Sequence, residues 1–260
     1  MSQRIDTIDE RMLGKLKVLV FENDELMAER AAEDVAREMR RVLKEKPELN
    51  IILSGAESQE KFLQALSKRE GIDWARVNYF AVDEFYAPGM DPAFRVSAQP
   101  LRIFSHLSLK SMNVIDFAPE SAEAERKRYE DLVRRSRPDI ACLGIGVSGH
   151  IAFNEPGQTD FNGTDDVRII TVGDSSAGQL MEDPNFMKLG AIPRKAITVT
   201  IPFLMRCPVV SVVVPYRIKA PIVKRLIESR DVTEDFPATI LKEKADAVLY
   251  LDRESYSLCE

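Results

Sequence analysis

Short apolar runs alternate with longer segments of mixed polarity along most of the chain. Residues 16–21 are mostly Val, Leu and Phe, which predicts a buried strand, and the Asn23-Asp24 pair is typical of a helix start. The next segment repeats its apolar residues at helical spacing, at Met27, Ala31, Val35, Met39 and Val42. Pro47 ends this predicted helix, because proline has no N–H to continue it.

The same two patterns continue toward the end of the chain. They predict strands over residues 49–54, 77–85, 112–117, 138–146, 167–173, 196–201, 209–214 and 247–252. They predict helices over residues 57–69, 94–107, about 120–136 and 217–229. Strands that alternate with helices indicate an α/β fold, an open, Rossmann-like, mainly parallel sheet with helices on both faces. No linker or repeat interrupts the pattern, so we expect a single domain over residues 1–260.

The composition narrows the class of protein. Of the 260 residues 45% are hydrophobic and 30% are charged, and the formal net charge of −6 argues against nucleic acid as a partner. The three cysteines are far apart and form no C-x-x-C pair, so neither a zinc site nor a disulfide framework is expected. The N-terminal segment is polar, and no apolar run approaches the roughly 20 residues of a membrane span. We expect a cytoplasmic protein without a membrane partner, metal or cofactor.

Polar loops follow four of the predicted strands, where open α/β sheets bind their ligands. After the second strand, Ser54-Gly55 opens a turn into a helix, where backbone N–H groups can bind phosphate with the hydroxyls of Ser54 and Ser58. The alternative is a plain capped turn. At the end of the third, Asp83 and Glu84 follow apolar residues, and a partly desolvated carboxylate there can act as a general base. The alternative is a pair of solvated acids or a helix cap.

His150 is one of only two histidines and lies in the stretch GIGVSGHIAFNEPG, residues 144–157. Imidazole titrates near neutral pH and can exchange a proton with a ligand, and Glu155 can orient its ring. Gly149 and nearby glycines let backbone and ligand approach closely, which a histidine buried for structure alone does not require. The spacing of these residues fits no metal motif, and His106 is expected on a helix surface. In the fourth loop Lys219, with Arg217 as a competitor, can pair with an anion or remain a surface charge.

The stretch LGIGVSGHIAFNEPG closely resembles the signature of the glucosamine-6-phosphate isomerase/deaminase family, which reads G-hydrophobic-G-x-D-G-H-I-A-F-N-E-P. VDEF is similar to the acidic motif of that family, SGAESQEKFLQAL stands in place of its phosphate loop, and PYRIKAPIVKRL stands where it has a phosphate-binding lysine. The similarity spans roughly residues 16–252, and residues 158–190 match least.

The resemblance implies a role for each candidate residue. Asp83 would move a proton between C2 and C1 of an open-chain amino sugar, and His150 with Glu155 would assist ring opening. The implied substrate-binding residues are Ser54, Gly55, Ser58, Ser148, Gly149 and Lys219. The reaction would convert glucosamine 6-phosphate and water to fructose 6-phosphate and ammonia, with a small sugar phosphate as partner and no metal. The family has both monomers and larger assemblies, so a homo-oligomer stays open.

Three departures from the family pattern concern substrate binding. Ser148 replaces an aspartate, and serine hydrogen-bonds but carries no charge. Glu57 brings a negative charge into the proposed phosphate loop, and residues 178–187 contain no arginine where relatives have one for phosphate. Two alternatives therefore stand beside the isomerase. One is a 6-phosphogluconolactonase-like hydrolase, which the retained Asn154-Glu155-Pro156 disfavours, and the other is a sugar-phosphate-binding protein without catalysis.

Overall fold

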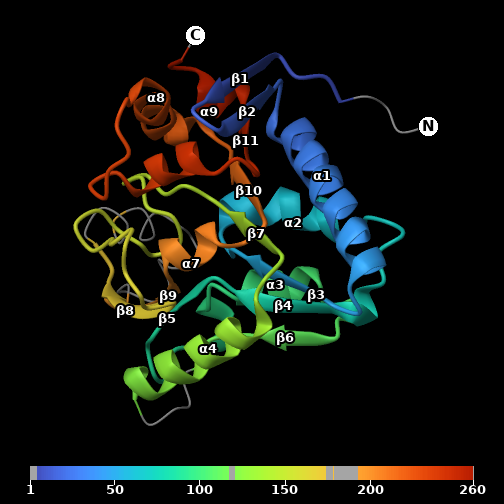
Figure 1. Cartoon of the computed structure of the whole chain (residues 1–260), viewed down its shortest axis with the longest axis vertical. Coiled ribbons are helices and arrows are strands. Elements are labelled where there is room, and N and C mark those ends of the chain that lie inside the picture. The colour runs from blue at the N-terminus through green and yellow to red at the C-terminus, as the bar shows by residue number, and fades with distance from the viewer. Residues whose placement is uncertain (1–4, 117–120, 174–177, 179–192, 260) are drawn as a thin grey trace.

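The computed structural model describes residues 5–116, 121–173, 178 and 193–259. Its main sheet has the strand order β1-β2-β11-β10-β7-β3-β4-β6, and every neighbouring pair except β1 with β2 is parallel (Figure 1). The strands are β1 (Asp9–Leu13), β2 (Leu16–Phe21), β3 (Leu49–Leu53), β4 (Val77–Ala81), β6 (Ser111–Asn113), β7 (Ile140–Leu143), β10 (Val209–Val214) and β11 (Ala247–Asp252). The predicted open and mainly parallel sheet is confirmed.

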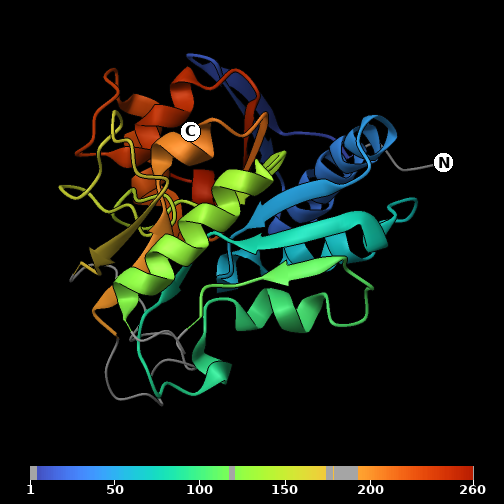
Figure 2. The ribbon, with the colours of Figure 1, turned by 60° about the horizontal axis from the view of Figure 1, so that its bottom comes forward.

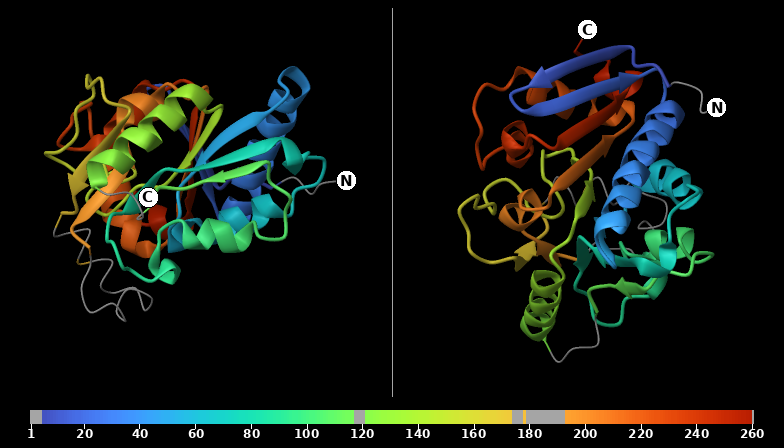
Figure 3. Two further views of the ribbon diagram at one scale, coloured as in Figure 1. Left: turned by 90° about the horizontal axis from the view of Figure 1, so that it is seen from below. Right: turned by 45° about the vertical axis from the view of Figure 1, so that its right-hand side comes forward.

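Helices cover both faces of this sheet, as the sequence predicts (Figures 2 and 3). One face carries α1 (Asp24–Glu45), α2 (Glu60–Ser67) and α3 (Ala98–Ile103), and the other carries α4 (Ala122–Ser136), α7 (Ile201–Met205) and α8 (Ala220–Glu228). The short helix α9 (Arg253–Tyr256) follows β11. The 3-10 turns are η1 (Glu57–Gln59), η2 (Trp74–Arg76), η3 (Pro92–Phe94), η4 (Arg217–Lys219) and η5 (Pro237–Glu243).

Two hydrophobic clusters lie on the two sides of the sheet. Successive side chains of a strand point to opposite faces, so Ile52 packs in the cluster under α4 while Ile51 and Leu53 pack in the cluster under α1. The helix α1 begins where predicted, because the side chain of Asn23 accepts a hydrogen bond of 2.9 Å from the N–H of Leu26. None of the described helices has both the length and the apolar character that crossing a membrane requires.

A second, antiparallel sheet contains β5 (Asp83–Phe85), β9 (Lys195–Val199) and β8 (Val167–Thr171) in that order. The single strand predicted over residues 77–85 is therefore wrong. The chain changes sheets at Val82, whose N–H donates to the carbonyl of Leu53 at 3.3 Å and whose carbonyl accepts from Val199 at 2.9 Å. All of residues 77–85 are buried, and Asp83 and Glu84 look like the polar end of one strand, so the sequence pattern does not reveal the change.

Other differences from the sequence prediction lie at polar or terminal segments. The strand β1 was not predicted, because it is an edge strand with the sequence DERML and alternates partly buried with exposed residues. The helix predicted over 94–107 is shorter, since α3 ends at Ile103. His106 is exposed in the turn that follows α3 rather than on the helix itself.

Four neighbouring parallel strands, β10, β7, β3 and β4, end at the same edge of the main sheet. Parallel strands all run in one direction, so the loops after them meet beyond their carboxyl ends. These are the loops that begin at Pro215, Gly144, Ser54 and Val82. The fold therefore gathers all four predicted polar loops on one side of the molecule.

The central strand β7 supports this edge, and its last residue, Leu143, is fully buried. We expect Leu143→Ala to lower the free energy of unfolding by about 2–5 kcal/mol, because it removes buried methyl groups and leaves a cavity. The matched control is Met12→Ala on the edge strand, where the side chain is 57% exposed. Urea unfolding followed by circular dichroism measures both changes, and equal losses for the two variants would contradict the burial of Leu143.

Candidate active site

The loop after β7 joins Ser148, His150 and Glu155 in one hydrogen-bonded cluster. The Ser148 hydroxyl donates to Glu155 Oε2 at 2.8 Å and lies 2.8 Å from His150 Nδ1, and Glu155 Oε1 lies 3.1 Å from the same nitrogen. A serine hydroxyl has one proton, and Glu155 accepts it, so Nδ1 is the donor toward Ser148. In the neutral ring the lone pair is then on Nε2, which suits that atom to take a proton from a ligand.

Two glycines of this loop are required by close packing around the histidine. A Cβ atom at Gly146 would lie 2.0 Å from His150 Nε2. Gly149 has φ +89°, and a Cβ there would lie 2.3 Å from the ring of Phe236. The backbone closes the turn through a bond of 3.0 Å from the N–H of Gly146 to the carbonyl of His150. Both glycines therefore pack against protein side chains, Gly146 against the imidazole and Gly149 against Phe236, and have no room for side chains of their own. The close approach of a ligand to this loop stays a prediction.

Asp83 is buried at the start of β5, with 7% of the residue exposed. Burial, and second the neighbouring charge of Glu84, raise the pKa of the Asp83 carboxyl well above its ordinary value. Within the described part of the chain its carboxyl group makes no hydrogen bond. Asp83 is thus not the solvated loop acid or helix cap that the sequence left open. It is a desolvated carboxyl group with a strengthened affinity for protons.

Glu84 has a different environment from Asp83. Its side chain bonds to residues 96–97, in the loop that follows β5. It is fully buried, and its two oxygens accept from the backbone N–H groups of Val96 at 2.8 Å and Ser97 at 3.0 Å and from the Ser97 hydroxyl at 2.7 Å. Burial raises the pKa of Glu84, and these hydrogen bonds oppose the increase. Glu84 therefore holds residues 96–97 in place, a role that the sequence did not indicate.

The strand β9 connects Asp83 to the histidine loop. Thr198 is paired directly opposite Asp83, and its hydroxyl accepts a hydrogen bond of 3.1 Å from the N–H of Phe153. The rings of Phe85 and Phe153 pack with their centroids 5.0 Å apart. The buried carboxyl of Asp83 and the loop that contains His150 are thus attached to the same strand residue. Thr198 was missed by the sequence analysis because it looks like an ordinary strand residue.

The loop after β3 has the features of an anion site. The N–H groups of Gly55, Glu57 and Ser58, around the start of η1, donate to no backbone or side-chain acceptor among the described residues. Such groups favour an anion. Two neighbouring N–H groups already have acceptors. That of Ser54 donates to the carbonyl of Cys142 at 3.0 Å, and that of Ala56 donates to the side-chain oxygen of Gln99 at 3.1 Å. The side chain of Glu57 is exposed to solvent.

Lys219 ends η4 in the loop after β10 and is the one predicted cation that is buried, with 6% exposed. Burial lowers the pKa of its ammonium group to about 8. Across residues 5–116, 121–173, 178 and 193–259, no carboxylate pairs with this ammonium and no acceptor bonds to it. The competing Arg217 is 75% exposed and lies 3.6 Å from Glu254. The structure thus distinguishes the two predicted cations by burial.

Gln59 connects the two loops of the anion site, and the sequence analysis did not select it. It is 1% exposed, and its side-chain amide donates to the carbonyl of Val213 in β10 at 3.0 Å. A Cβ at Gly144, after β7, would lie 2.9 Å from the same amide nitrogen. The ends of β7 and β10 and the turn η1 are therefore packed around one buried glutamine. In the sequence it resembles any polar residue at a helix start.

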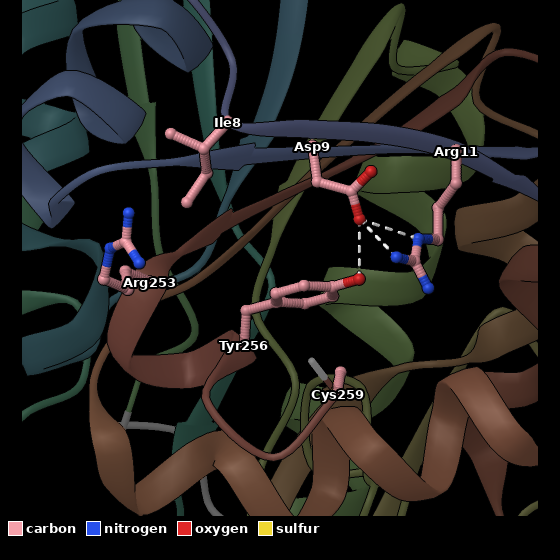
Figure 4. Close-up of a pocket in the computed structure, with 6 residues that line it drawn as sticks. All are labelled: Ile8, Asp9, Arg11, Arg253, Tyr256 and Cys259. Carbon is pink, nitrogen blue, oxygen red and sulfur yellow. Dashed lines mark hydrogen bonds and ion pairs between the residues drawn. The ribbon is translucent and has the colours of Figure 1, made fainter.

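Other features of the described residues do not add a metal or a second reactive cluster. Within the part of the chain that the structure describes, no group of three or more His, Cys, Asp or Glu side chains is arranged to hold a metal ion. A hollow between β1 and α9 is lined by Ile8, Asp9, Arg11, Arg253, Tyr256 and Cys259, none of which is a candidate site residue (Figure 4). The arginine-free stretch 178–187 lies outside the described residues except for Gly178.

Comparisons with known proteins show what this chain is similar to. The family model for glucosamine-6-phosphate isomerases/6-phosphogluconolactonase matches residues 22–250. A glucosamine-6-phosphate deaminase of Thermoanaerobacter pseudethanolicus is 29% identical over 255 residues, which cover 94% of this chain and 95% of the relative. A protein of the same name from Bacillus cereus strain G9842 is 30% identical over 248 residues, covering 94% and 89% of the two chains.

Two solved structures have the same fold. A monomeric glucosamine-6-phosphate deaminase superposes with a TM-score of 0.81 at 26% identity, covering 93% of this chain and 99% of the other. A 6-phosphogluconolactonase from Plasmodium vivax superposes with a TM-score of 0.76 at 17% identity, covering 94% and 92%. The second likeness is a likeness of fold alone.

The packing of Gly149 gives a test of the histidine loop. We expect Gly149→Ala to destabilise the fold by more than about 2 kcal/mol, because the new methyl group adds a clash with Phe236 to the backbone strain of a positive φ. Gly157→Ala is the matched control, since Gly157 has φ +76° and nothing lies within 4 Å of a Cβ there. Chemical unfolding of both variants separates clash from strain, and a smaller loss at Gly149 than at Gly157 would refute the packing described.

Proposed function

Because the chain belongs to the family of glucosamine-6-phosphate isomerases and 6-phosphogluconolactonases, we propose that it is a glucosamine-6-phosphate deaminase. It converts an amino-sugar phosphate to a ketose phosphate and releases ammonia. The observation that carries this proposal is the pairing of a desolvated Asp83 with the His150 loop on one strand residue, Thr198. Such a site has two separate proton-transfer groups, which opening and isomerising an aldose require. Residues of β9 share a hydrophobic cluster with the main sheet, and Thr198 bonds to the histidine loop, which supports a single domain.

Phosphate binding in this proposal uses the two loops that Gln59 connects. The ammonium group of Lys219 supplies the counter-charge, and the N–H groups of Gly55, Glu57 and Ser58 supply hydrogen bonds. The hydroxyls of Ser54 and Ser58, both partly exposed, are further donors. A phosphate would restore a charge partner to a buried cation, so its binding energy can hold the sugar in a fixed orientation. This distal contact directs the other end of the sugar toward the acid–base groups.

Ring opening is assigned to the cluster after β7. His150 Nε2 takes the proton of the anomeric hydroxyl and returns it to the ring oxygen as the C1–O bond to that oxygen breaks. Glu155, held by Ser148, stabilises the imidazolium that forms between these two transfers. Ser148 contributes orientation without a charge. Gly149, predicted to bind the substrate, can offer only backbone atoms here, because the ring of Phe236 occupies the position of a Cβ.

Isomerisation is assigned to Asp83. Its carboxylate takes the proton from C2 of the open-chain aldehyde. The electron pair of that bond forms a C1–C2 double bond while the C1–O π bond breaks toward O1, which takes a proton from the C2 ammonium group and becomes a hydroxyl. The carboxylic acid then returns its proton to C1, and the nitrogen lone pair forms a protonated imine at C2. Water adds to that imine and ammonia leaves, so the ketose phosphate is formed without an oxidant. The raised pKa of Asp83 suits this step because the C2 proton is only weakly acidic.

A substrate panel tests the proposal and separates it from the two alternatives. The purified chain is incubated with glucosamine 6-phosphate, other amino-sugar 6-phosphates and 6-phosphogluconolactone, and ammonia, ketose phosphate and 6-phosphogluconate are measured. Ammonia and ketose phosphate in equal amounts support the deaminase. Release of 6-phosphogluconate alone would indicate a lactonase, and calorimetric binding of a sugar phosphate with no product would indicate a binding protein.

Asp83→Asn tests the assigned base. We expect turnover to fall by about 10²–10⁴-fold, the usual contribution of a general base, while binding of an unreactive sugar phosphate stays unchanged. The folded-state pKa of Asp83 is raised, so its contribution to stability is lost as the pH rises through that pKa. Asp83→Asn should therefore also raise the thermal midpoint at neutral pH. Asp235→Asn, at an exposed position, is the control. Full turnover by Asp83→Asn would reject this residue as the base.

The lowered pKa of Lys219 predicts a pH dependence of binding. With a sugar-alcohol 6-phosphate, which cannot isomerise, the dissociation constant should rise as the pH increases through about 8, because the unliganded ammonium group loses its proton there. The increase should approach about tenfold per pH unit above that point. Titration calorimetry between pH 7 and pH 9.5 measures it. Lys219→Met should bind weakly with no such dependence, and the same pH dependence in this variant would exclude Lys219 as its source.

A further inference from the structure

Tyr216, three residues before Lys219, has a backbone conformation that favours glycine. Its φ is 80° and its ψ is 144°. This region is nearly restricted to glycine, because a Cβ atom clashes with the backbone there. Among the described residues other than glycine, only Arg137, Ala152 and Tyr216 have a positive φ. A bulky residue in this conformation requires other contacts to hold it.

In the turn that Tyr216 begins, an apolar side chain is exposed and a charged one is buried, the opposite of the usual preference. Ile218 is 51% exposed, whereas Lys219, the next residue, is 6% exposed. An isoleucine in water and an ammonium group in the interior are both unfavourable when left to themselves. The backbone of the turn therefore sets the direction of these side chains. A relaxed turn would allow the ammonium group to return to water.

Both polar groups of the Tyr216 backbone are used to fix the turn. Its N–H faces the carboxylate of Asp252, at 3.3 Å from Oδ1 and 3.2 Å from Oδ2. Its carbonyl accepts a hydrogen bond of 2.9 Å from the N–H of Lys219. One residue thus connects the carboxylate of Asp252 to the backbone of Lys219. The orientation of Tyr216 decides where η4 starts.

Asp252 is a rigid anchor for this contact. It is 3% exposed, ends β11, and is paired with Phe21 of β2. Its Oδ1 also accepts a bond of 2.8 Å from the N–H of Ser255, which caps α9. Asp252 is not an ion-pair partner of Lys219 in the described structure, and burial alone accounts for the lowered pKa of that lysine. The direct contact between Asp252 and the turn that contains Lys219 is therefore made at the N–H of Tyr216, and an indirect one runs through α9, which packs beside η4.

We propose that Asp252 is a positioning residue for phosphate binding, which holds Tyr216 in its strained conformation and thereby directs Lys219 into the site. This inference rests on the proposed function, because it takes Lys219 to be the phosphate ligand. The end of β11 lies outside the four loops of the site, and the inference gives it a role in substrate affinity. The simpler alternative is that Asp252 only caps α9.

Asp252→Asn separates these two roles. Asparagine caps helices as well as aspartate does, and its side-chain oxygen can keep the bond to Ser255. Its NH₂ group then occupies the position of Oδ2 and faces the N–H of Tyr216, so two donors oppose each other there and Oδ1, at 3.3 Å, is the one acceptor left to that N–H. We expect the dissociation constant for a sugar-alcohol 6-phosphate to rise about tenfold, with KM for the reacting substrate rising in parallel and kcat changing little. Ser255→Ala, which alters the cap alone, should leave phosphate binding unchanged.

Replacing Tyr216 in the Asp252→Asn background provides the decisive comparison. Glycine adopts the conformation of Tyr216 without steric cost, so Asp252→Asn with Tyr216→Gly should bind within about twofold of the wild type. Alanine also removes the ring but keeps the Cβ atom, so Asp252→Asn with Tyr216→Ala should stay weak. Calorimetry with the sugar-alcohol 6-phosphate measures all variants, and thermal unfolding checks that each is folded.

The outcomes distinguish this inference from the function on which it rests. Rescue by glycine and not by alanine supports it. Unchanged affinity in Asp252→Asn, or equal rescue by glycine and alanine, would overturn it while the deaminase assignment stands. Wild-type protein that binds no sugar phosphate would overturn both.

Discussion

The parallel pairing of β10, β7, β3 and β4 is the constraint on which the rest of the molecule depends. Parallel strands need long crossovers, and these crossovers form the helices that cover both faces. The same arrangement places the carboxyl ends of these four strands at one edge of the sheet. Polar groups that are far apart in the sequence, such as Ser54, His150 and Lys219, are therefore brought to one side without any contact among them being required to fold the chain.

The carboxyl edge contains charges that the fold alone does not compensate. Asp83 is buried beside a second acid, and Lys219 is buried with no charged partner among the described residues. Each lowers the stability of the unliganded protein, because desolvation penalises a charged group. A sugar phosphate supplies what both lack, a dianion for the lysine and a proton source for the carboxylate. Burial is therefore the source both of the loss of stability and of the reactivity proposed for these two groups.

Much of the fold and of the site could be predicted because these features have strong local signals. Periodicity located the parallel strands and α1, and the glycine-rich stretch around His150 identified the family and the partner Glu155. Sequence reasoning failed where an apolar run conceals a change of sheet, as at Val82, and where an edge strand is polar, as in β1. Contacts between distant segments give no local signal at all, so Gln59, Thr198 and Asp252 emerged only from the structure.

Ser148 stands where the family that the stretch resembles has an aspartate, and among the described residues the carboxylate found against the imidazole is that of Glu155. The Ser148 hydroxyl links the imidazole to Glu155, which supports the ring-opening role proposed for this cluster. The central claim is that one sugar phosphate spans the edge from Lys219 to Asp83. A crystal structure with a bound sugar-alcohol 6-phosphate tests it directly. The account predicts the phosphate against Lys219 Nζ and the N–H groups of η1, with C2 facing the Asp83 carboxylate. A phosphate bound away from Lys219, or a sugar chain directed away from Asp83, would contradict it.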